Sequence, residues 1–522
     1  MNLSDRLVSV FSPERALKRH VARQKLNIIN SGYSNSGASR TKKSMVGWMF
    51  SGGSTKEDID DNLTVLRERS RDLYMNTPIA TGALKTINTN VVGAGLRLNA
   101  QIDYEVLGMS QLEADAWETQ VEREFELWSE SIFCDAMRMN NFYDLQQIAF
   151  LSFLMSGETF VTLPFMEKPN MPYQLSISLL EADRVCSPQG NTTDKIINGV
   201  EVGAYGEVTH YHIAQFHPLA KTFGEKKWMR VEKFGKESGR QNVLHLMEAE
   251  RPEQRRGVPL LSPVIESVKQ LGRYSEAELM AALVSSMYTV FIKSENPNEP
   301  PYGEVIPDGQ RVDDEDENSY ELAAGAIISL GENESIEQAN PMRNNSSFDG
   351  FVKAVCRQIG SALEVPYELL LKHFTASYSA SRAALLEAWK MFRKRRAWMA
   401  ARFCQPVYEE WLTEAILLGR IDAPGFFDDP IIRKAYTGAE WNGPSQGQLD
   451  PLKEVKAAVM RVDEGFSTRA RETSELTGGD FWRNHPQRIR EENARRESGL
   501  GKPSKEGPTD IGEEVETDEN SD

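Results

Sequence analysis

The amino-acid sequence predicts a mainly helical α+β protein, and three patterns support this prediction. The longest apolar repeat with helical spacing occupies residues 257–292. A second helical region covers residues 346–420, and it is interrupted by Pro366 and by a short loop rich in Ser and Thr. Short strand-like runs separated by turn residues lie between positions 158 and 213. The chain therefore combines a large helical part with a smaller β region.

The first 45 residues predict a flexible basic arm. Residues 1–43 contain nine Lys or Arg against two acids, followed by a stretch rich in Ser, Gly and Asn. An arm that contacts DNA or a scaffold protein is the alternative interpretation.

The segment 63–100 predicts a helix interrupted at Pro78, then a turn through Gly93 and Gly95 into a strand. Glycines that follow a helix and precede a strand have the reverse order of a dinucleotide-binding loop, so we expect no nucleotide site there. Residues 112–128 predict an amphipathic helix whose aromatic stripe belongs to the core, namely Trp117, Val121, Phe125 and Trp128.

A further helix is predicted over residues 144–155, ending at Gly157. The dipeptide Asn198-Gly199 predicts a hairpin turn in the β region. Alternation along a strand places His210 and His212 on one face, which raises the possibility of a metal site with His217 and His245. No Cys or acid stands nearby at a convincing ligand spacing, so a strand at the edge of the core is the preferred interpretation.

The segment 358–389 is the most informative part of the chain. An apolar helix runs into Pro366, a polar loop follows, and strong helix formers resume at Arg382. Ser379 or Ser381 is the expected N-cap of the second helix. A polar loop between two stable helices suits a small probe that reaches into open space.

Residues 390–402 carry six bases and no acid, which permits two interpretations. One is a DNA-binding helix. The other, which we prefer, is a helix whose bases pair with acids, some on another copy, while Trp389, Phe392, Trp398 and Met399 pack inward.

Composition excludes several classes of protein. The chain has 522 residues, a net charge of −17 and 26% charged residues, which describes a soluble protein that does not bind nucleic acid by bulk attraction. No apolar run is long enough to span a membrane, and residues 1–10 lack the core of a signal peptide. The four scattered cysteines suggest reduced thiols in a cytosolic setting. No phosphate-binding loop, Gly-x-Ser-x-Gly or His-Glu-x-x-His motif is present, so we expect no enzyme.

Three stretches resemble the lambda-type family of tailed-phage portal proteins. They are residues 365–389, VPYELLLKHFTASYSASRAALLEAW; residues 69–100, RSRDLYMNTPIATGALKTINTNVVGAGLRLNA; and residues 441–482, beginning WNGPSQGQLDPLKEVKAAV. The resemblance implies a portal fold that follows the basic N-terminal arm 1–45. Its expected parts are a mixed α/β wing (46–260), a first stem helix (261–292), a clip (293–345), a second stem helix (346–371), a tunnel loop (372–381), a wing helix (382–420), a helical crown (421–500) and a disordered acidic tail (501–522).

This resemblance also implies a function. The expected assembly is a ring of identical subunits, twelve in the virion, which initiates head assembly and forms the channel for double-stranded DNA at one capsid vertex. The expected partners are terminase, the major capsid or scaffold protein and the head-completion or neck proteins, with assembly in the host cytoplasm. No membrane, cofactor or metal is implied.

The resemblance assigns two groups of site residues. The tunnel loop would contact DNA through Lys372, His373, Phe374, Thr375, Ala376, Ser377 and Tyr378. The acidic clip would dock terminase and connector proteins through Asp313, Asp314, Glu315, Asp316 and Glu317, a run without the spacing of a calcium loop. Two alternatives remain: a nuclease or motor that uses the basic helix and a histidine-lined metal site, and a capsid adaptor that never encloses DNA.

Overall fold

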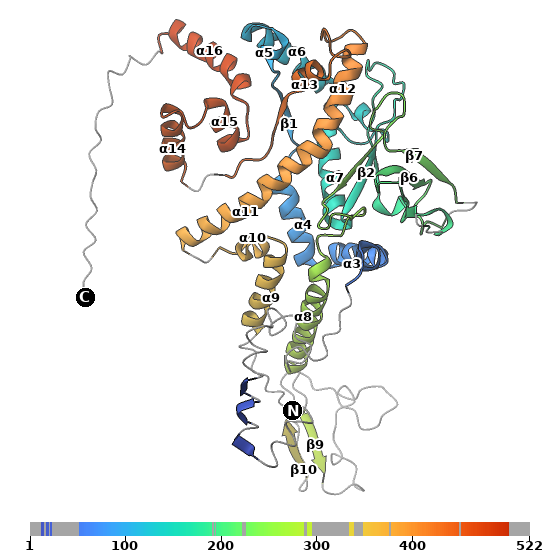
Figure 1. Ribbon diagram of the computed structural model, residues 1–522. Helices are drawn as coiled ribbons and strands as arrows, with labels where there is room; N and C mark the ends of the chain where they lie inside the picture. The colour runs from blue at the N-terminus through green and yellow to red at the C-terminus, as the bar shows by residue number, and fades with distance from the viewer. Residues whose placement is uncertain are drawn as a thin grey trace, which may run out of the picture. The chain divides into compact units, whose positions relative to one another are not determined.

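The computed structural model (Figure 1) describes residues 12–14, 17–19, 21–22, 52–190, 193, 195–221, 226–286, 290–294, 334–338, 348–374, 377–447 and 450–500. The chain forms two compact units, Met1–Asp58 and Ile59–Asp522, and the features below belong to the second, apart from a π-helical turn that spans the boundary. Most of the predicted arm and the whole tail lie outside the described residues. The same holds for most of the clip.

Helices at the start of the second unit form one side of the core. Their bounds are α3 Leu63–Asn76, α4 Pro78–Val91, α5 Tyr104–Leu107, α6 Gln111–Ser129 and α7 Phe142–Ser156, preceded by a π-helical turn at Lys56–Asp60. Pro78 occupies the first turn of α4, where its missing N–H costs no hydrogen bond. Ser110 and Glu113 form a reciprocal capping box at the start of α6. The predicted break at Pro78 is therefore confirmed.

Two antiparallel sheets form the β region. The first has the order β3-β2-β8, with β2 Glu158–Thr162 between β3 Ser178–Leu180 and β8 Val243–Met247. The second has the order β4-β5-β6-β7, with bounds Ile196–Ile197, Val200–Val202, Val208–Ala214 and Trp228–Glu232. Asn198 and Gly199 both have positive φ, 46° and 81°, which confirms the predicted tight turn.

A two-stranded ladder joins distant parts of the sequence. β1 Arg97–Ala100 pairs antiparallel with β11 Ala439–Asn442, and Leu98 lies opposite Trp441. The first strand was predicted. The second was not, because residues 421–500 were expected to be helical. The four residues of β11 are too few to show a strand periodicity in the sequence. They form a strand because β1 supplies the backbone hydrogen-bond partners.

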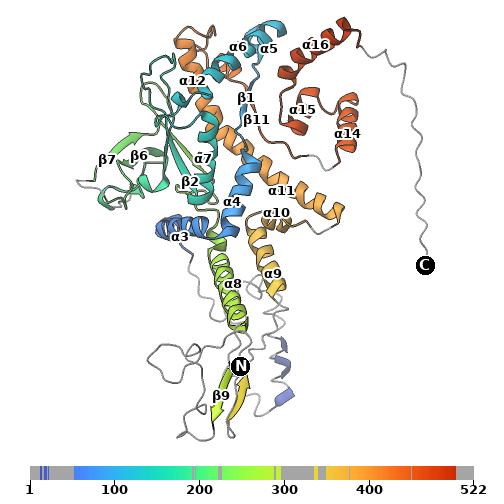
Figure 2. The same cartoon turned by 180° about the vertical axis from the view of Figure 1, so that it is seen from behind.

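The chain then runs through α8 Ile265–Ser286, β9 Val290–Ser294, β10 Glu334–Gln338, α9 Phe348–Ala362 and α10 Tyr367–Leu371. α8 packs against α9, and β9 pairs antiparallel with β10 (Figure 2). The predicted helix 261–292 is therefore wrong at both ends. The observed helix α8 begins after a 3₁₀ turn, Ser262–Val264. The last residues of the predicted helix form β9, where Val290, Phe291 and Ile292 have high strand propensity. The second stem helix, predicted as 346–371, is two helices instead of one.

The C-terminal half begins with a long, nearly continuous helix. α11 Tyr378–Met399 passes through a π-helical turn, Ala400–Cys404, into α12 Gln405–Leu417. Pro406 lies just after this turn, where the altered hydrogen-bond pattern accommodates its missing N–H. The remaining helices are α13 Pro430–Tyr436, α14 Pro451–Asp463, α15 Arg469–Thr477 and α16 Phe481–Glu497.

Aromatic side chains from α6, α7, α12 and β11 build the centre of the core. The ring of Phe125 lies 5.0 Å from that of Trp411 and 5.7 Å from that of Phe142. The predicted stripe of Trp117, Val121, Phe125 and Trp128 is buried in this core, as expected. No helix within the described residues combines the length and apolar character needed to cross a membrane.

Candidate functional site

Within the segment 357–394, α9 ends in a sharp bend at residues 360–366, which we call the elbow. The short helix α10, a loop and the long helix α11 follow. At the elbow, the N–H of Val365 donates to the carbonyl of Gly360 (2.9 Å) and the N–H of Glu364 donates to that of Ser361 (3.5 Å). This is the Schellman pattern of a helix C-terminus, and it places Glu364 at a positive φ of 57°. Gly360 is required here, because a Cβ at this position would lie 2.5 Å from the carbonyl oxygen of Val365. The elbow therefore has a defined backbone geometry.

The short helix α10 ends with the same geometry. Lys372 is its C-cap with φ 53°, and the N–H of His373 donates to the carbonyl of Glu368 (3.0 Å). Lys372 thus closes a helix, and it is exposed together with His373 and Phe374, whose exposed fraction is 52%. Thr375 and Ala376 lie outside the described residues.

The predicted loop 372–381 is too long at its C-terminal end. α11 begins at Tyr378, and Ser377 is the N-cap whose hydroxyl accepts a hydrogen bond from the N–H of Ala380 (3.4 Å). Ser379 and Ser381, the expected caps, lie inside the helix. Sequence could not choose among three serines spaced by two residues, because each can cap and none strongly opposes helix.

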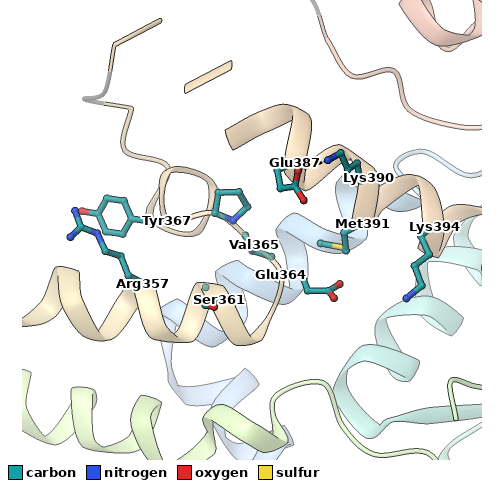
Figure 3. Close-up of a pocket in the computed structure, with 11 residues that line it drawn as sticks. Arg357, Ser361, Glu364, Val365, Tyr367, Glu387, Lys390, Met391 and Lys394 are labelled. Atoms are coloured by element: carbon teal, nitrogen blue, oxygen red, sulfur yellow. Dashed lines mark hydrogen bonds and ion pairs between the residues drawn. The ribbon is translucent and has the colours of Figure 1, made fainter. Parts of the chain in front are cut away.

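A cleft of about 560 Å³ lies between the elbow and α11. Its apolar surface comes from Gly360, Val365, Pro366 and Met391, and its charged residues are Arg357, Glu364, Glu387, Lys390 and Lys394. Figure 3 shows Arg357 beside Tyr367 toward one side of the cleft and Lys394 toward the other, with Val365 and Met391 between them. The guanidinium of Arg357 lies 5.4 Å from the centre of the Tyr367 ring. Lys390 is paired with Glu387, at 2.6 Å.

The basic segment 390–402 mostly follows the packing interpretation. Arg396 donates to the carbonyls of Val91 (3.1 Å) and Asn90 (2.9 Å), and Arg395 is buried. Arg393 lies 3.7 Å from Glu475. The large apolar residues pack inward as expected: Trp389, Phe392 and Met399 are buried, and the ring of Trp398 lies 4.5 Å from that of Phe153 at a tilt of 33°. Two of the six bases point into the protein, which weakens the case for a DNA-reading helix.

The histidines divide between several environments. His210 and His212 share a face of β6, as predicted, and His212 lies 3.1 Å from Glu201. Arg230 makes two hydrogen bonds to the same carboxylate, both 2.8 Å, and these lower the pKa of Glu201 to about 2. A fixed cation at this position repels a metal ion. Within the described part of the chain, no three His, Cys, Asp or Glu residues are grouped to hold a metal.

His245, the last of the four histidines considered as metal ligands, belongs to a buried charge cluster that the sequence did not reveal. Glu158, at the start of β2, is fully buried and accepts hydrogen bonds from Arg67, from Arg256 (2.7 Å), from His245 (2.7 Å) and from the N–H of Gly257 (2.8 Å). Burial by itself would raise the pKa of Glu158, but the charges of Arg256 and Arg67 hold it well below its usual range. Burial lowers the pKa of Arg67 to about 10, against the opposing effect of Glu158.

The charge cluster joins α3, β2, β8 and the residues just before α8. Arg256 also donates to the carbonyls of Val185 and Ala182, both at 2.9 Å. Gly157 and Gly257 permit this junction, because a Cβ on Gly157 would lie 2.3 Å from the backbone of Val258. In the sequence, Glu158 follows Gly157 and Arg256 precedes Gly257, about 100 positions apart. No pattern in the residues around either one indicates that the two side chains meet.

The acidic clip residues Asp313, Asp314, Glu315, Asp316 and Glu317 lie outside the described residues. The described ends of that segment are β9 and β10, in which Ile292 lies opposite Ile336.

Comparison with known proteins identifies the family. The model of the family described as phage portal protein, lambda family, matches residues 41–396. The chain is 26% identical over 463 residues to portal protein B of Escherichia phage lambda, an alignment that covers 85% of this chain and 86% of that protein. It is 25% identical over 460 residues to the portal protein of Escherichia phage N15, covering 84% and 85%.

A solved structure is also similar. It is a chain from the neck of a native gene transfer agent particle computed with C12 symmetry, with 15% identity, coverage of 80% of this chain and 93% of that chain, and a TM-score of 0.43. Since the family match spans more than half of the sequence, the chain belongs to the lambda family of phage portal proteins.

Proposed function

We propose that twelve copies of this chain form a closed ring at one capsid vertex, through which double-stranded DNA enters during packaging and leaves during ejection. The role is structural and non-enzymatic. Assembly in the host cytoplasm involves the major capsid or scaffold protein and initiates the head. Terminase docks on the ring during packaging, and head-completion or neck proteins replace it later.

The exposed apolar surface of the stem carries this proposal, together with the family. Leu279 and Met280 on α8 and Phe351 on α9 have exposed fractions of 62%, 58% and 46%. The two helices are held together, since the ring of Tyr274 lies 5.6 Å from that of Phe348 and 4.6 Å from that of Phe351. A stem that is packed internally but apolar outside fits closed cyclic symmetry, in which adjacent copies cover these side chains.

Net charge also suits a conduit. Twelve copies at −17 each carry about −200, so the ring as a whole does not gain by holding phosphates through counterion release. Duplex DNA of any sequence then passes without tight binding, while single exposed cations such as Lys372 contact phosphates briefly.

Electron microscopy of the purified, negatively stained protein tests the assembly. We expect rings with a central hole at least as wide as a DNA duplex. A monomer that stays stable at micromolar concentration, whatever the salt or scaffold protein added, would contradict the proposal.

Replacing Phe374, Thr375 and Ala376 by Gly-Ser-Gly tests the tunnel loop. Loop length and the N-cap Ser377 are kept, so the ring should survive the replacement. Packaged DNA should reach full length but become nuclease-sensitive after the motor leaves, because twelve contacts with the channel are lost at once. Deleting the same three residues shows whether loop length adds to the effect. Full DNA retention by the Gly-Ser-Gly particles, or failure of the ring to form, would remove the loop from this role.

The clip is proposed to dock terminase through its acidic run. Reversing Asp313–Glu317 to lysines should weaken terminase binding most at low salt, where exposed charges act over longer distances. Equal affinity at every ionic strength would show that the run is not the docking surface.

A further inference from the structure

The cleft between the elbow and α11 has more positive charge than its own acids neutralise. Glu387 is already paired with Lys390 at 2.6 Å. Neither Lys394 nor Arg357 has an acidic partner among the residues that the structure describes. Within the described part of the chain, the guanidinium of Arg357 lies over the ring of Tyr367 and makes no hydrogen bond, which leaves its N–H groups available to an anion.

The remaining acid of the cleft, Glu364, acts on a buried cation behind it. Arg395 follows Lys394 on α11, is only 6% exposed, and its Nη1 has no hydrogen-bond partner. Burial lowers the pKa of Arg395, and the charges of Glu248 and Glu364 oppose that shift. A buried guanidinium that lacks part of its hydrogen-bond partners is costly, and Arg395 adds positive potential behind the cleft, next to Lys394 on α11.

The shape of the cleft selects the kind of anion. Its apolar surface lies between the charged residues, with Val365 and Met391 between Arg357 and Lys394 (Figure 3). A DNA duplex presents phosphates on a convex surface and offers no apolar group to this floor. An extended peptide that combines carboxylates with aliphatic side chains fits both the cations and the apolar surface of the cleft.

The chain itself contains such a peptide. The sequence Asp510-Ile-Gly-Glu-Glu-Val-Glu516 places Ile511 and Val515 among four carboxylates. It belongs to the C-terminal segment, residues 501–522, which lies outside the described residues. The residues from Leu500 to Ile511 span at most about 40 Å when extended.

We propose that this acidic C-terminal segment binds in the cleft. Its carboxylates pair with Arg357 and Lys394, and Ile511 and Val515 cover the apolar floor. Occupation neutralises the exposed cations of α11 and withholds them from DNA phosphates. The interaction does not require ring assembly and should also occur in an unassembled chain.

Zero-length carbodiimide cross-linking of the full chain, followed by mass spectrometry, tests the proposal. Cross-links should join Lys394 to Asp510, Glu513, Glu514 or Glu516 more often than they join the exposed Lys456 of α14. Lys390–Glu387 is an internal control, because its two side chains are 2.6 Å apart and neither is substituted in the variants below. Mixing isotope-labelled and unlabelled chains reports whether the segment comes from the same chain or from an adjacent copy.

Two variants separate a specific site from general attraction. Arg357→Gln should reduce the Lys394 cross-links about fivefold, which corresponds to ~1 kcal/mol, whereas Arg488→Gln on α16 should not. The double substitution Ile511→Ser and Val515→Ser should reduce them similarly while every charge is kept. Cross-links spread evenly over surface lysines, or unchanged in either variant, would overturn the proposal. So would a short DNA duplex that binds in an Arg357-dependent way while the cross-links do not depend on Arg357.

Discussion

The aromatic core of the proposed wing and the three C-terminal helices of the proposed crown differ sharply in how much they bury. In that core, Phe125 alone touches five aromatic rings, from Trp128, Phe142, Tyr408, Trp411 and, on β11, Trp441. In the crown helices α14, α15 and α16, Ala458 and Glu472 are the only buried residues among those described. The exposed apolar residues of the crown include Leu452, Val455, Val459, Met460, Phe466, Trp482 and Ile489. The aromatic core is therefore closed within one chain, and β11 contributes to it, whereas α14, α15 and α16 leave most of their large apolar side chains exposed.

The largest loss of stability should follow from a substitution that leaves a cavity in the aromatic core around Phe125. Phe125→Ala should lower the free energy of unfolding by about 3–5 kcal/mol, because it leaves a cavity among packed aromatic rings. Chemical denaturation of the unassembled chain, followed by near-ultraviolet circular dichroism, measures this loss. The control is Leu127→Ala on the exposed side of the same helix, expected within about 0.5 kcal/mol. Similar losses for the two variants would mean that the wing core is not what holds the chain together.

Ion pairs sharpen the same contrast. Glu158→Gln should destabilise the chain by about 3–5 kcal/mol, because it leaves Arg67 and Arg256 buried without a counter-charge. Glu126→Gln removes the pair with Arg483 (2.9 Å) between the wing and the crown, where both side chains are more than a third exposed. That pair is worth at most about 1 kcal/mol. If the two variants unfold at the same denaturant concentration, burial does not distinguish the two ion pairs.

The buried cluster also predicts acid sensitivity. Burial lowers the pKa of His245 below its ordinary value of 6.5, although Glu158 partly opposes the shift. Below pH 6.5 the unfolded chain binds a proton that the folded chain does not, so stability should fall as the pH falls toward the lowered pKa. His245→Gln should reduce that slope between pH 6.5 and 5.5, measured as thermal midpoint against pH. An unchanged slope in the variant would assign the acid sensitivity to other groups.

The smallest effect is expected in the crown. Val459→Ala should change the stability of the unassembled chain by less than about 0.5 kcal/mol, because this side chain is 52% exposed. In the assembled ring the same substitution should ease dissociation, measured by the denaturant needed to release subunits. A loss above about 1 kcal/mol without assembly would show that the crown buries this face within one chain.

The candidate site shows which details local sequence can predict. The expected break before Pro366 is present, but α9 already ends at Ala362 and Pro366 is the N-cap of α10. The helix–loop–helix order around Lys372 was correct. The start of the next helix was predicted four residues too late, since three serines compete as its cap and their side chains do not differ in kind. The residues of the strand Val290–Ser294 were mostly predicted as helix, because a short apolar run is compatible with the periodicity of a helix and of a strand. Only the pairing with β10 decides between the two.

The sequence by itself determined the main helices, the turn at Asn198-Gly199, the aromatic stripe around Phe125 and the resemblance to portal proteins. These features depend on spacing within about 30 residues, so local propensity and periodicity carry them. Only the tertiary structure decided that β1 pairs with β11, that Glu158 collects Arg67, Arg256 and His245, and that Arg395 turns inward. Those pairings join residues that are tens to hundreds of positions apart. Their energy comes from burial and from satisfying charges that no neighbour along the chain can reach.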